Sequence, residues 1–203
     1  MECIQEITKS NEKLEIMTDE SCESPREWDN LTVIVTIKNN HHDIGDIQVN
    51  SSEELREMLE VKKALFSMPL YIYEHSGMSL KCFEDKIPKY PYNDQWDAGC
   101  IGMVFTTEAL LKEAGLTTMP KKEVQEQMKT EIETYSQWCN GECYGFRLSK
   151  WSKCDKCNQV EDKEIDSCYG FYGCDHDMNG LYDAILENSK VFKTYDDLDE
   201  FLK

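Results

Sequence analysis

The alternation of apolar and polar positions predicts strands through the middle of the chain. The segment "LTVIVTIKNN" (31–40) is rich in β-branched residues and has turn residues on both sides, which is typical of a strand. The segment "MPLYIYEHSGMSLKCF" (68–83) predicts two strands around a turn at His75-Ser76-Gly77. The segment "QWDAGCIGMVFTT" (95–107) predicts a loop that leads into another strand. Short turns between these strands indicate hairpins.

Two aromatic segments further along the chain predict one more antiparallel hairpin. They are "YGFRLSKW" (144–151) and "EIDSCYGFYG" (164–173), and a polar segment rich in turn residues joins them. We expect Trp151 to lie opposite Glu164 in this hairpin. A shift of one residue in this register would move every side chain to the other face.

Helical spacing of apolar residues predicts five helices. A serine and an acidic first turn cap the first, Gly115 ends the second and Asn140-Gly141 ends the third. The predicted helices cover residues 51–65, 106–116, 119–141, 178–188 and 194–203. Hairpins mixed with helices favour an α+β fold: a mainly antiparallel sheet built from hairpins and flanked by three to five helices.

The domain organisation follows from a change in composition. Residues 1–27 are polar and charged, and they predict a mobile or loosely packed N-terminal extension. Residues 28–203 carry the apolar pattern and predict a single α+β domain.

The net charge of −18, from 40 acidic and 22 basic residues, limits the partners that the protein can bind. A surface of this charge repels nucleic acid and anionic membranes. Its simplest consequence is solubility, and a sharper interpretation is an acidic face that meets a basic protein surface. The terminal "YDDLDEFLK" supplies carboxylates for such a face: Asp196, Asp197, Asp199 and Glu200.

Ten cysteines occur in a chain whose first residues lack the basic and apolar parts of a secretory signal. We therefore expect free thiols and a cytoplasmic protein. No apolar run approaches the roughly 18 residues of a membrane-spanning helix, so we expect no membrane association.

Six cysteines and one histidine gather in residues 139–176 and raise the question of zinc. A straight strand over 144–151 would hold Cys143 and Cys154 roughly 30 Å apart, which argues against one four-cysteine site. The hairpin register instead predicts a cluster at its base and a separate pair at its tip. The base cluster is Cys139, Cys143, Cys174 and His176, and the tip pair is Cys154 and Cys157. We favour unliganded side chains and no cofactor, with zinc as the alternative.

A small-molecule pocket is a further hypothesis because a tryptophan precedes an aspartate twice. These pairs and other polar residues between apolar segments would line one cleft for a nucleotide-type ligand. The candidates are Trp28, Asp29, Asn30, His75, Trp96, Asp97, Asp166, Cys168 and Tyr172. More often, such a tryptophan packs under a loop while the aspartate caps backbone amides. A nucleophilic Cys168 beside Asp166 would make an enzyme, but a strand position does not lower the pKa of a thiol.

Five motifs resemble a family of uncharacterised phage and mobile-element proteins over roughly residues 24–188. They are "SPREWDNL", "PLYIYEHSG", "QWDAGCIGMVF", "ETYSQWCNGECYGF" and "EIDSCYGFYG". Members of that family typically carry serine and glutamine where this chain has Ala98 and Cys100. The resemblance implies a phage or mobile-element origin and hence the cytoplasm of a bacterial host, but it supplies no catalytic residues.

The leading hypothesis is a non-enzymatic, acidic protein that binds and inhibits a host defence effector, such as a nuclease, as a partial nucleic-acid mimic. The alternatives are a pocket protein that sequesters or processes a nucleotide-type signal, and a zinc-containing interaction domain.

Overall fold

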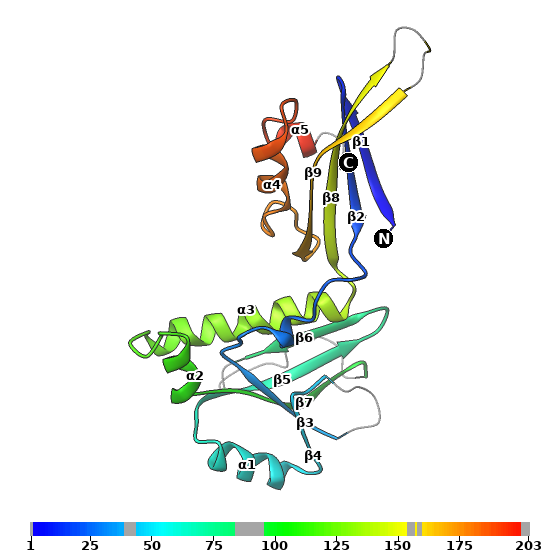
Figure 1. Cartoon of the computed structure of the whole chain (residues 1–203). Coiled ribbons are helices and arrows are strands. Elements are labelled where there is room, and N and C mark those ends of the chain that lie inside the picture. Colours follow the sequence, from blue (N-terminus) through cyan, green and yellow to red (C-terminus); the bar gives the residue numbers. More distant parts are fainter. Residues whose placement is uncertain (1, 39–43, 84–95, 154–156, 158–159, 200–203) are drawn as a thin grey trace. The chain divides into compact units, whose positions relative to one another are not determined.

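The structure, a computed structural model, describes the whole chain except residues 1, 39–43, 84–95, 154–156, 158–159 and 200–203. The chain folds into two compact units. Residues 1–23 and 141–203 form what we call the terminal unit, and residues 24–140 form the inserted unit. In the described residues, nine strands and five α-helices make two mostly antiparallel sheets, which confirms the predicted α+β class (Figure 1).

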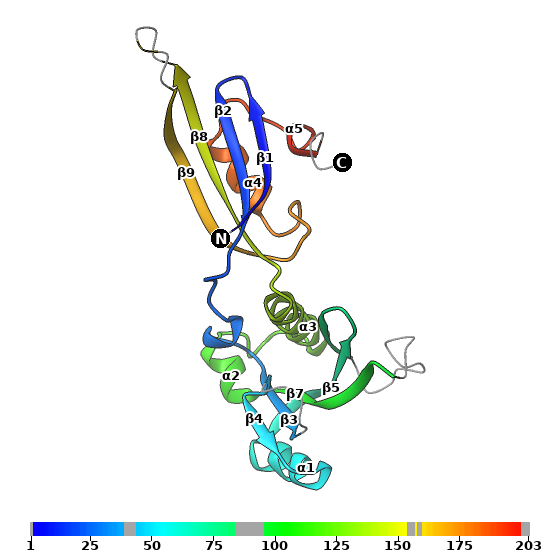
Figure 2. The same ribbon diagram turned by 90° about the vertical axis from the view of Figure 1, so that its right-hand side faces the viewer.

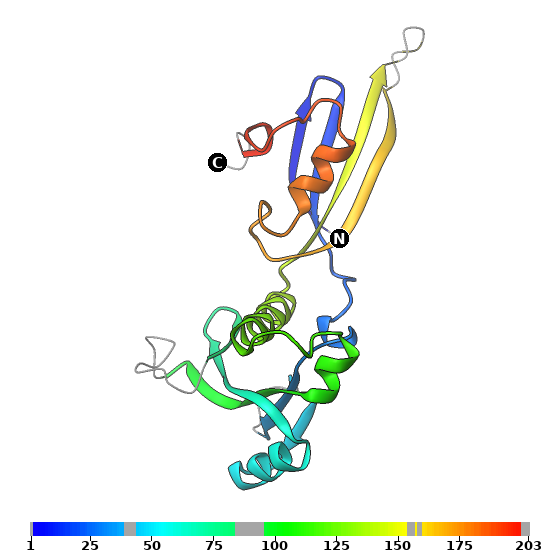
Figure 3. The same cartoon turned by 90° about the vertical axis from the view of Figure 1, so that its left-hand side faces the viewer.

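The terminal unit is a four-stranded antiparallel sheet with helices on one face. The strands are β1 (Cys3–Lys9), β2 (Glu12–Thr18), β8 (Cys143–Lys153) and β9 (Val160–Tyr172), in the order β1-β2-β8-β9. Helices α4 (Leu181–Asn188) and α5 (Asp196–Asp199) lie over the same face of this sheet, which Figure 3 shows with α4 in front.

Burial of alternate residues explains why the first two strands form. Leu14 and Ile16 of β2 pack with Phe146 and Leu148 of β8 in one core with Ile185 of α4, and each is at most 1% exposed. The predicted loose extension over residues 1–27 is therefore wrong for residues 3–18. The alternation in "EKLEIMT" carries a strand signal that the high charge of the segment concealed.

The inserted unit is a five-stranded sheet between two helices. Its elements are a 3-10 helix, η1 (Pro25–Glu27), then β3 (Val33–Ile37), β4 (Ile47–Val49), α1 (Ser52–Val61), β5 (Ala64–Glu74), β6 (Met78–Cys82), β7 (Ala98–Thr107), α2 (Glu108–Glu113) and α3 (Lys121–Cys139). The strand order is β4-β3-β7-β5-β6, with β3 and β4 parallel and the other pairs antiparallel. Helix α3 covers one face and α1 packs on the other (Figures 1 and 2).

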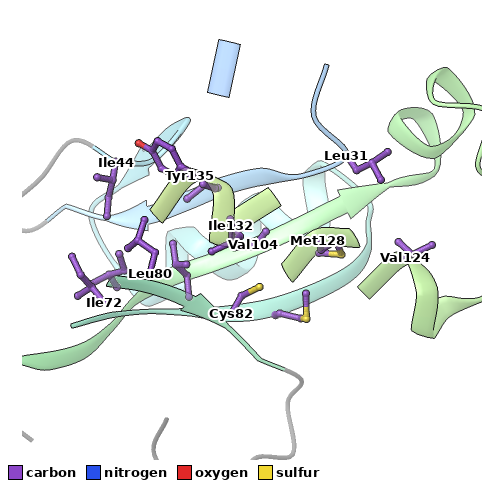
Figure 4. Close-up of a cluster of buried hydrophobic side chains, with 14 of the residues drawn as sticks. Leu31, Ile44, Ile72, Leu80, Cys82, Val104, Val124, Met128, Ile132 and Tyr135 are labelled. Atoms are coloured by element: carbon purple, nitrogen blue, oxygen red, sulfur yellow. The ribbon is translucent and has the colours of Figure 1, made fainter. Parts of the chain in front are cut away.

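The core of the inserted unit contains apolar side chains at the helical spacing that predicted the helix over 119–141. Val124, Met128 and Ile132 of α3 are fully buried against the sheet, as Figure 4 shows. Neighbouring strand residues point to opposite faces, so that Val104 meets α3 while Phe105 lies in the cluster with α1. Residues 24–140 thus have a core of their own, and the predicted single domain over 28–203 is replaced by two units.

The predicted hairpin exists, and its register is correct at the base. Tyr144 lies opposite Phe171, as the expected pairing requires, but two bulges shift the rest. Gly170 and Ile165 are the extra residues on β9, so Trp151 faces Asp162 rather than Glu164. Gly170 has a φ of +86°, which a glycine adopts without strain.

Candidate functional site

The face of the terminal sheet opposite α4 and α5 carries a chain of charged side chains across all four strands. Within the terminal unit no described element packs on this face, which is toward the viewer in Figure 2. We call the chain the carboxylate ladder; its members are Glu6 on β1, Lys13 and Glu15 on β2, Arg147 on β8, and Asp162 and Glu164 on β9.

Two cations hold the four carboxylates of the ladder together. Lys13 lies 3.0 Å from Glu6 and 2.9 Å from Glu15. These hydrogen bonds, to Glu15 first and Glu6 second, raise the pKa of Lys13. Arg147 lies 3.5 Å from Glu15 and 3.3 Å from Glu164, and it also reaches Asp162. The four carboxylates and two cations of the ladder leave an excess of two negative charges.

Sequence reasoning missed the ladder because half of it lies in the segment expected to be loose. The signal was present as charged residues that alternate with Leu14 and Ile16 in β2. Pairing with β8 places Glu15 beside Arg147, a contact that no local pattern reveals.

Among the described carboxylates of the acidic surface predicted near the C-terminus, Asp197 stabilises local structure. Asp197 accepts hydrogen bonds from the backbone N–H groups of Lys193 and Thr194 and forms an ion pair with Lys9. Asp196 is exposed on the same short helix. The side chain of Asp199 and all of Glu200 lie outside the described residues.

Three of the predicted pocket residues line one cavity in the inserted unit. Trp28, Asp29 and Asn30 follow η1 and face the end of α2 across a cavity of about 630 Å³. The described lining consists of Arg26, Trp28, Asp29, Asn30, Thr32, Val33, Asp46, Leu110, Glu113 and Ala114. The Trp28 side chain is 44% exposed, so its indole is open to solvent and ligands.

The charged groups of this cavity do not favour an anionic ligand. Asp46 binds Arg26 through both carboxylate oxygens, and Thr32 accepts from the same guanidinium through its hydroxyl and its carbonyl. Four of the five N–H donors of Arg26 are therefore already used within the protein. The side chains of Asp29 and Glu113 form no hydrogen bond or ion pair with any residue that the structure describes.

The other pocket candidates lie elsewhere. His75 and Asp97 form an exposed pair with Nδ1 and Oδ2 at 2.8 Å, and Trp96 is 95% exposed; none of the three is among the described lining residues of the cavity. Asp166, Cys168 and Tyr172 lie on β9 of the terminal unit. The predicted single cleft thus reduces to Trp28, Asp29 and Asn30.

The four residues predicted as a metal cluster at the hairpin base each have a separate environment in the structure. Cys139 is the last residue of α3 and packs against the core of the inserted unit, where burial raises its pKa to about 11. His176 lies against the rings of Tyr144 and Tyr182. Burial lowers the pKa of this imidazole. Cys174 is exposed, and so is Cys157 of the tip pair, whereas Cys154 lies outside the described residues. Within the described part of the chain, no three His, Cys, Asp or Glu side chains are grouped to bind a metal ion.

The terminal unit contains a pair of contacting thiols that the sequence did not predict. The side chain of Cys143, which is 1% exposed, is hydrogen-bonded to Cys22. The two residues are 121 positions apart, and the segment after β2 meets the start of β8 there.

Comparison with protein-family models, with curated proteins and with solved structures found no match to this chain. Among the described residues, no helix has the length and apolar character needed to cross a membrane.

Proposed function

We propose that this protein is a binding protein without enzymatic activity, and that its acidic terminal unit docks on a basic surface of another protein. The observation that carries the proposal is the carboxylate ladder on a sheet face that no described element of the terminal unit covers. Three of its four carboxylates are at least one-third exposed: Glu6 at 54%, Asp162 at 37% and Glu164 at 52%.

The charge of the surrounding unit supports a basic partner. Residues 1–23 and 141–203 contain 21 acidic and 10 basic residues, a net charge of −11 out of −18 for the whole chain. Such a field speeds association with a positive surface and repels nucleic acid.

The particular function we propose is inhibition of a defence effector in the cytoplasm of a bacterial host, by occupation of its nucleic-acid-binding surface. Two considerations support this form: the negative charge, and the resemblance of the motifs at residues 24–188 to phage and mobile-element proteins. It is a more specific proposal than basic-surface binding, and it can fail while the general one holds.

A pair of matched variants tests the role of the ladder. The first carries Glu6→Gln, Asp162→Asn and Glu164→Gln; the control carries Glu53→Gln, Glu57→Gln and Glu60→Gln on the exposed face of α1. Both remove three negative charges. Each variant is immobilised, and the proteins that it captures from a bacterial host lysate are quantified by mass spectrometry.

We expect the ladder variant to lose about tenfold or more of the affinity for basic captured proteins, because each partly exposed charge contributes about 0.5 kcal/mol. The α1 control should retain the same proteins. Equal capture by both variants, with unchanged circular dichroism, would show that the ladder is not the docking surface.

A second candidate function is a small-molecule pocket protein, which the cavity at Trp28, Asp29 and Asn30 favours. Because Asp46 and Thr32 already hold Arg26, the cavity suits a cationic or neutral ligand better than a nucleotide-type signal. Native mass spectrometry of protein purified without chelator tests this. A retained organic mass that Trp28→Ala abolishes and Trp96→Ala preserves would favour this function; a bare polypeptide would exclude a tightly held ligand.

A further inference from the structure

The chain leaves the terminal unit after Glu23 and returns to it at Gly141. One hydrogen bond joins these two segments directly, and two more bind each of them to the end of β9. The N–H of Asp19 donates to the carbonyl of Cys143 at 2.8 Å. The N–H of Gly173 donates to the carbonyl of Glu142 at 2.8 Å, and the hydroxyl of Tyr172 donates to the carbonyl of Glu23 at 2.6 Å. The backbone segments around Cys22 and Cys143 are therefore fixed next to each other.

The two thiols share one small environment. Cys143 is buried, Cys22 is partly exposed, and their side chains are hydrogen-bonded. Burial first, and then the thiols of Cys22 and Cys143, raise the pKa of Tyr172 to about 12. The phenol thus lies within electrostatic range of both thiols.

We propose that Cys22 and Cys143 form a disulfide on exposure to a disulfide oxidant such as glutathione disulfide, and that this bond ties the two ends of the inserted unit together. Cysteines in side-chain contact need little backbone movement to reach the short S–S distance. The loop that the bond closes contains all of residues 24–140.

The chemistry is two thiol–disulfide exchanges. Cys22, the more exposed thiol, loses its proton to solvent, and its thiolate attacks one sulfur of glutathione disulfide. One glutathione leaves as a thiolate and takes up a proton. Cys143 then loses its proton to solvent, and its thiolate attacks Sγ of Cys22. The second glutathione leaves as a thiolate and takes up a proton. Two protein thiols are oxidised to one disulfide, and one glutathione disulfide is reduced to two glutathione thiols.

The second exchange is intramolecular, and this offsets the unfavourable ionisation of a buried thiol. Burial, the hydrogen bond to Cys22 and the nearby Asp19 and Glu142 all raise the pKa of Cys143, so little thiolate is present near neutral pH. The fixed contact supplies a high effective concentration of the attacking group.

The disulfide would make the stability of the terminal unit less dependent on the folding of the inserted unit. Strands β2 and β8 pair in the sheet although the whole inserted unit lies between them in the sequence. When the inserted unit is unfolded, this pairing must therefore close a long flexible loop, which costs conformational entropy. A bond between Cys22 and Cys143 fixes the ends of that loop. The terminal unit should then stay folded after the inserted unit has melted.

The test is oxidation of the purified full chain with glutathione disulfide, followed by alkylation of the remaining thiols and peptide mapping. We expect the Cys22–Cys143 peptide pair to be the most abundant intramolecular disulfide. Cys22→Ser, at the more exposed position, should abolish it, while Cys3→Ser leaves it unchanged.

Thermal melting of the oxidised protein gives a second result. Oxidation should raise the melting temperature of the terminal unit, and Cys22→Ser should remove this shift. Recovery of Cys22 and Cys143 in alkylated or glutathione-bound form, or a preferred disulfide between two other cysteines, would overturn the proposal.

Discussion

The carboxylate of Glu12 accepts a hydrogen bond from the hydroxyl of Ser189 at 2.6 Å, and both residues are only 2% exposed. The contact joins the start of β2 to the turn after α4. The same hydroxyl accepts from the backbone N–H groups of Val191 and Phe192, and Glu12 accepts a further bond from Lys190. Burial of the Glu12 carboxylate is tolerated because Ser189 and Lys190 donate hydrogen bonds to it.

Removal of this hydroxyl should destabilise the terminal unit. Ser189→Ala leaves the Glu12 carboxylate buried with one donor fewer, and we expect a loss of about 1–3 kcal/mol in the free energy of unfolding. Urea unfolding followed by circular dichroism measures this. Ser152→Ala on the exposed end of β8 is the control; an equal effect of the two substitutions would contradict the assignment.

Glu131 of α3 should stabilise the start of β3. Its carboxylate accepts from the N–H groups of Leu31 and Thr32 and from the hydroxyl of Thr32 at 2.6 Å. We expect Glu131→Ala to reduce the free energy of unfolding of the inserted unit by about 2 kcal/mol. Glu133→Ala, at an exposed position of the same helix, should change it by less than about 0.5 kcal/mol.

The stability contribution of Asp197 should disappear in acid. The hydrogen bond from Lys9 and those from the backbone at Lys193 and Thr194 lower the pKa of Asp197 from 3.8 to about 2. A carboxyl group whose pKa is lower in the folded state stabilises that state above the unfolded pKa, and it loses this effect as the pH falls through the folded pKa.

The difference in melting temperature between the wild type and Asp197→Asn should therefore be constant above about pH 5 and shrink from about pH 4 to about pH 2. Asp196→Asn on the same helix serves as the control and should show no such trend. A difference that grows as the pH falls would contradict the assigned sign.

Thiol reactivity should separate the cysteines by environment. Burial raises the pKa of Cys139 to about 11 and that of Cys82 to about 12, whereas Cys157, Cys168 and Cys174 are exposed. Alkylation with iodoacetamide near pH 8 should modify the exposed group first, because the thiolate is the reactive form. Mass spectrometry against time gives the order, and early modification of Cys139 would contradict its placement in the core.

Local patterns in the sequence predicted the helices and most of the strands after residue 30. The capped helix at 51–65 appears as α1, ending at Val61 because β5 begins at Ala64, and its cap is Ser51, whose hydroxyl accepts from the N–H of Glu54. Gly115 and Gly141 follow α2 and α3 with a φ of +72°, the conformation that favours glycine after a helix.

The remaining features depend on contacts between distant segments. The expected register held at Tyr144 and Phe171, but the bulges at Gly170 and Ile165 could not be seen in an alternating pattern. A cluster of Cys139 with His176 required the hairpin to continue past Cys143, where the chain instead joins α3. The ladder and the Cys22–Cys143 pair both depend on the pairing of β2 with β8, which closes across more than a hundred residues.

The salt dependence of binding tests the central claim most directly. The affinity of the wild-type protein for its most enriched basic partner is measured by calorimetry from about 50 mM to about 500 mM sodium chloride, because screening acts on exposed charges over this range. Docking through the carboxylate ladder requires the dissociation constant to rise by about tenfold or more, and the variant with Glu6, Asp162 and Glu164 neutralised to show a smaller rise. A dissociation constant that does not change with salt would contradict the electrostatic account even where binding itself is real.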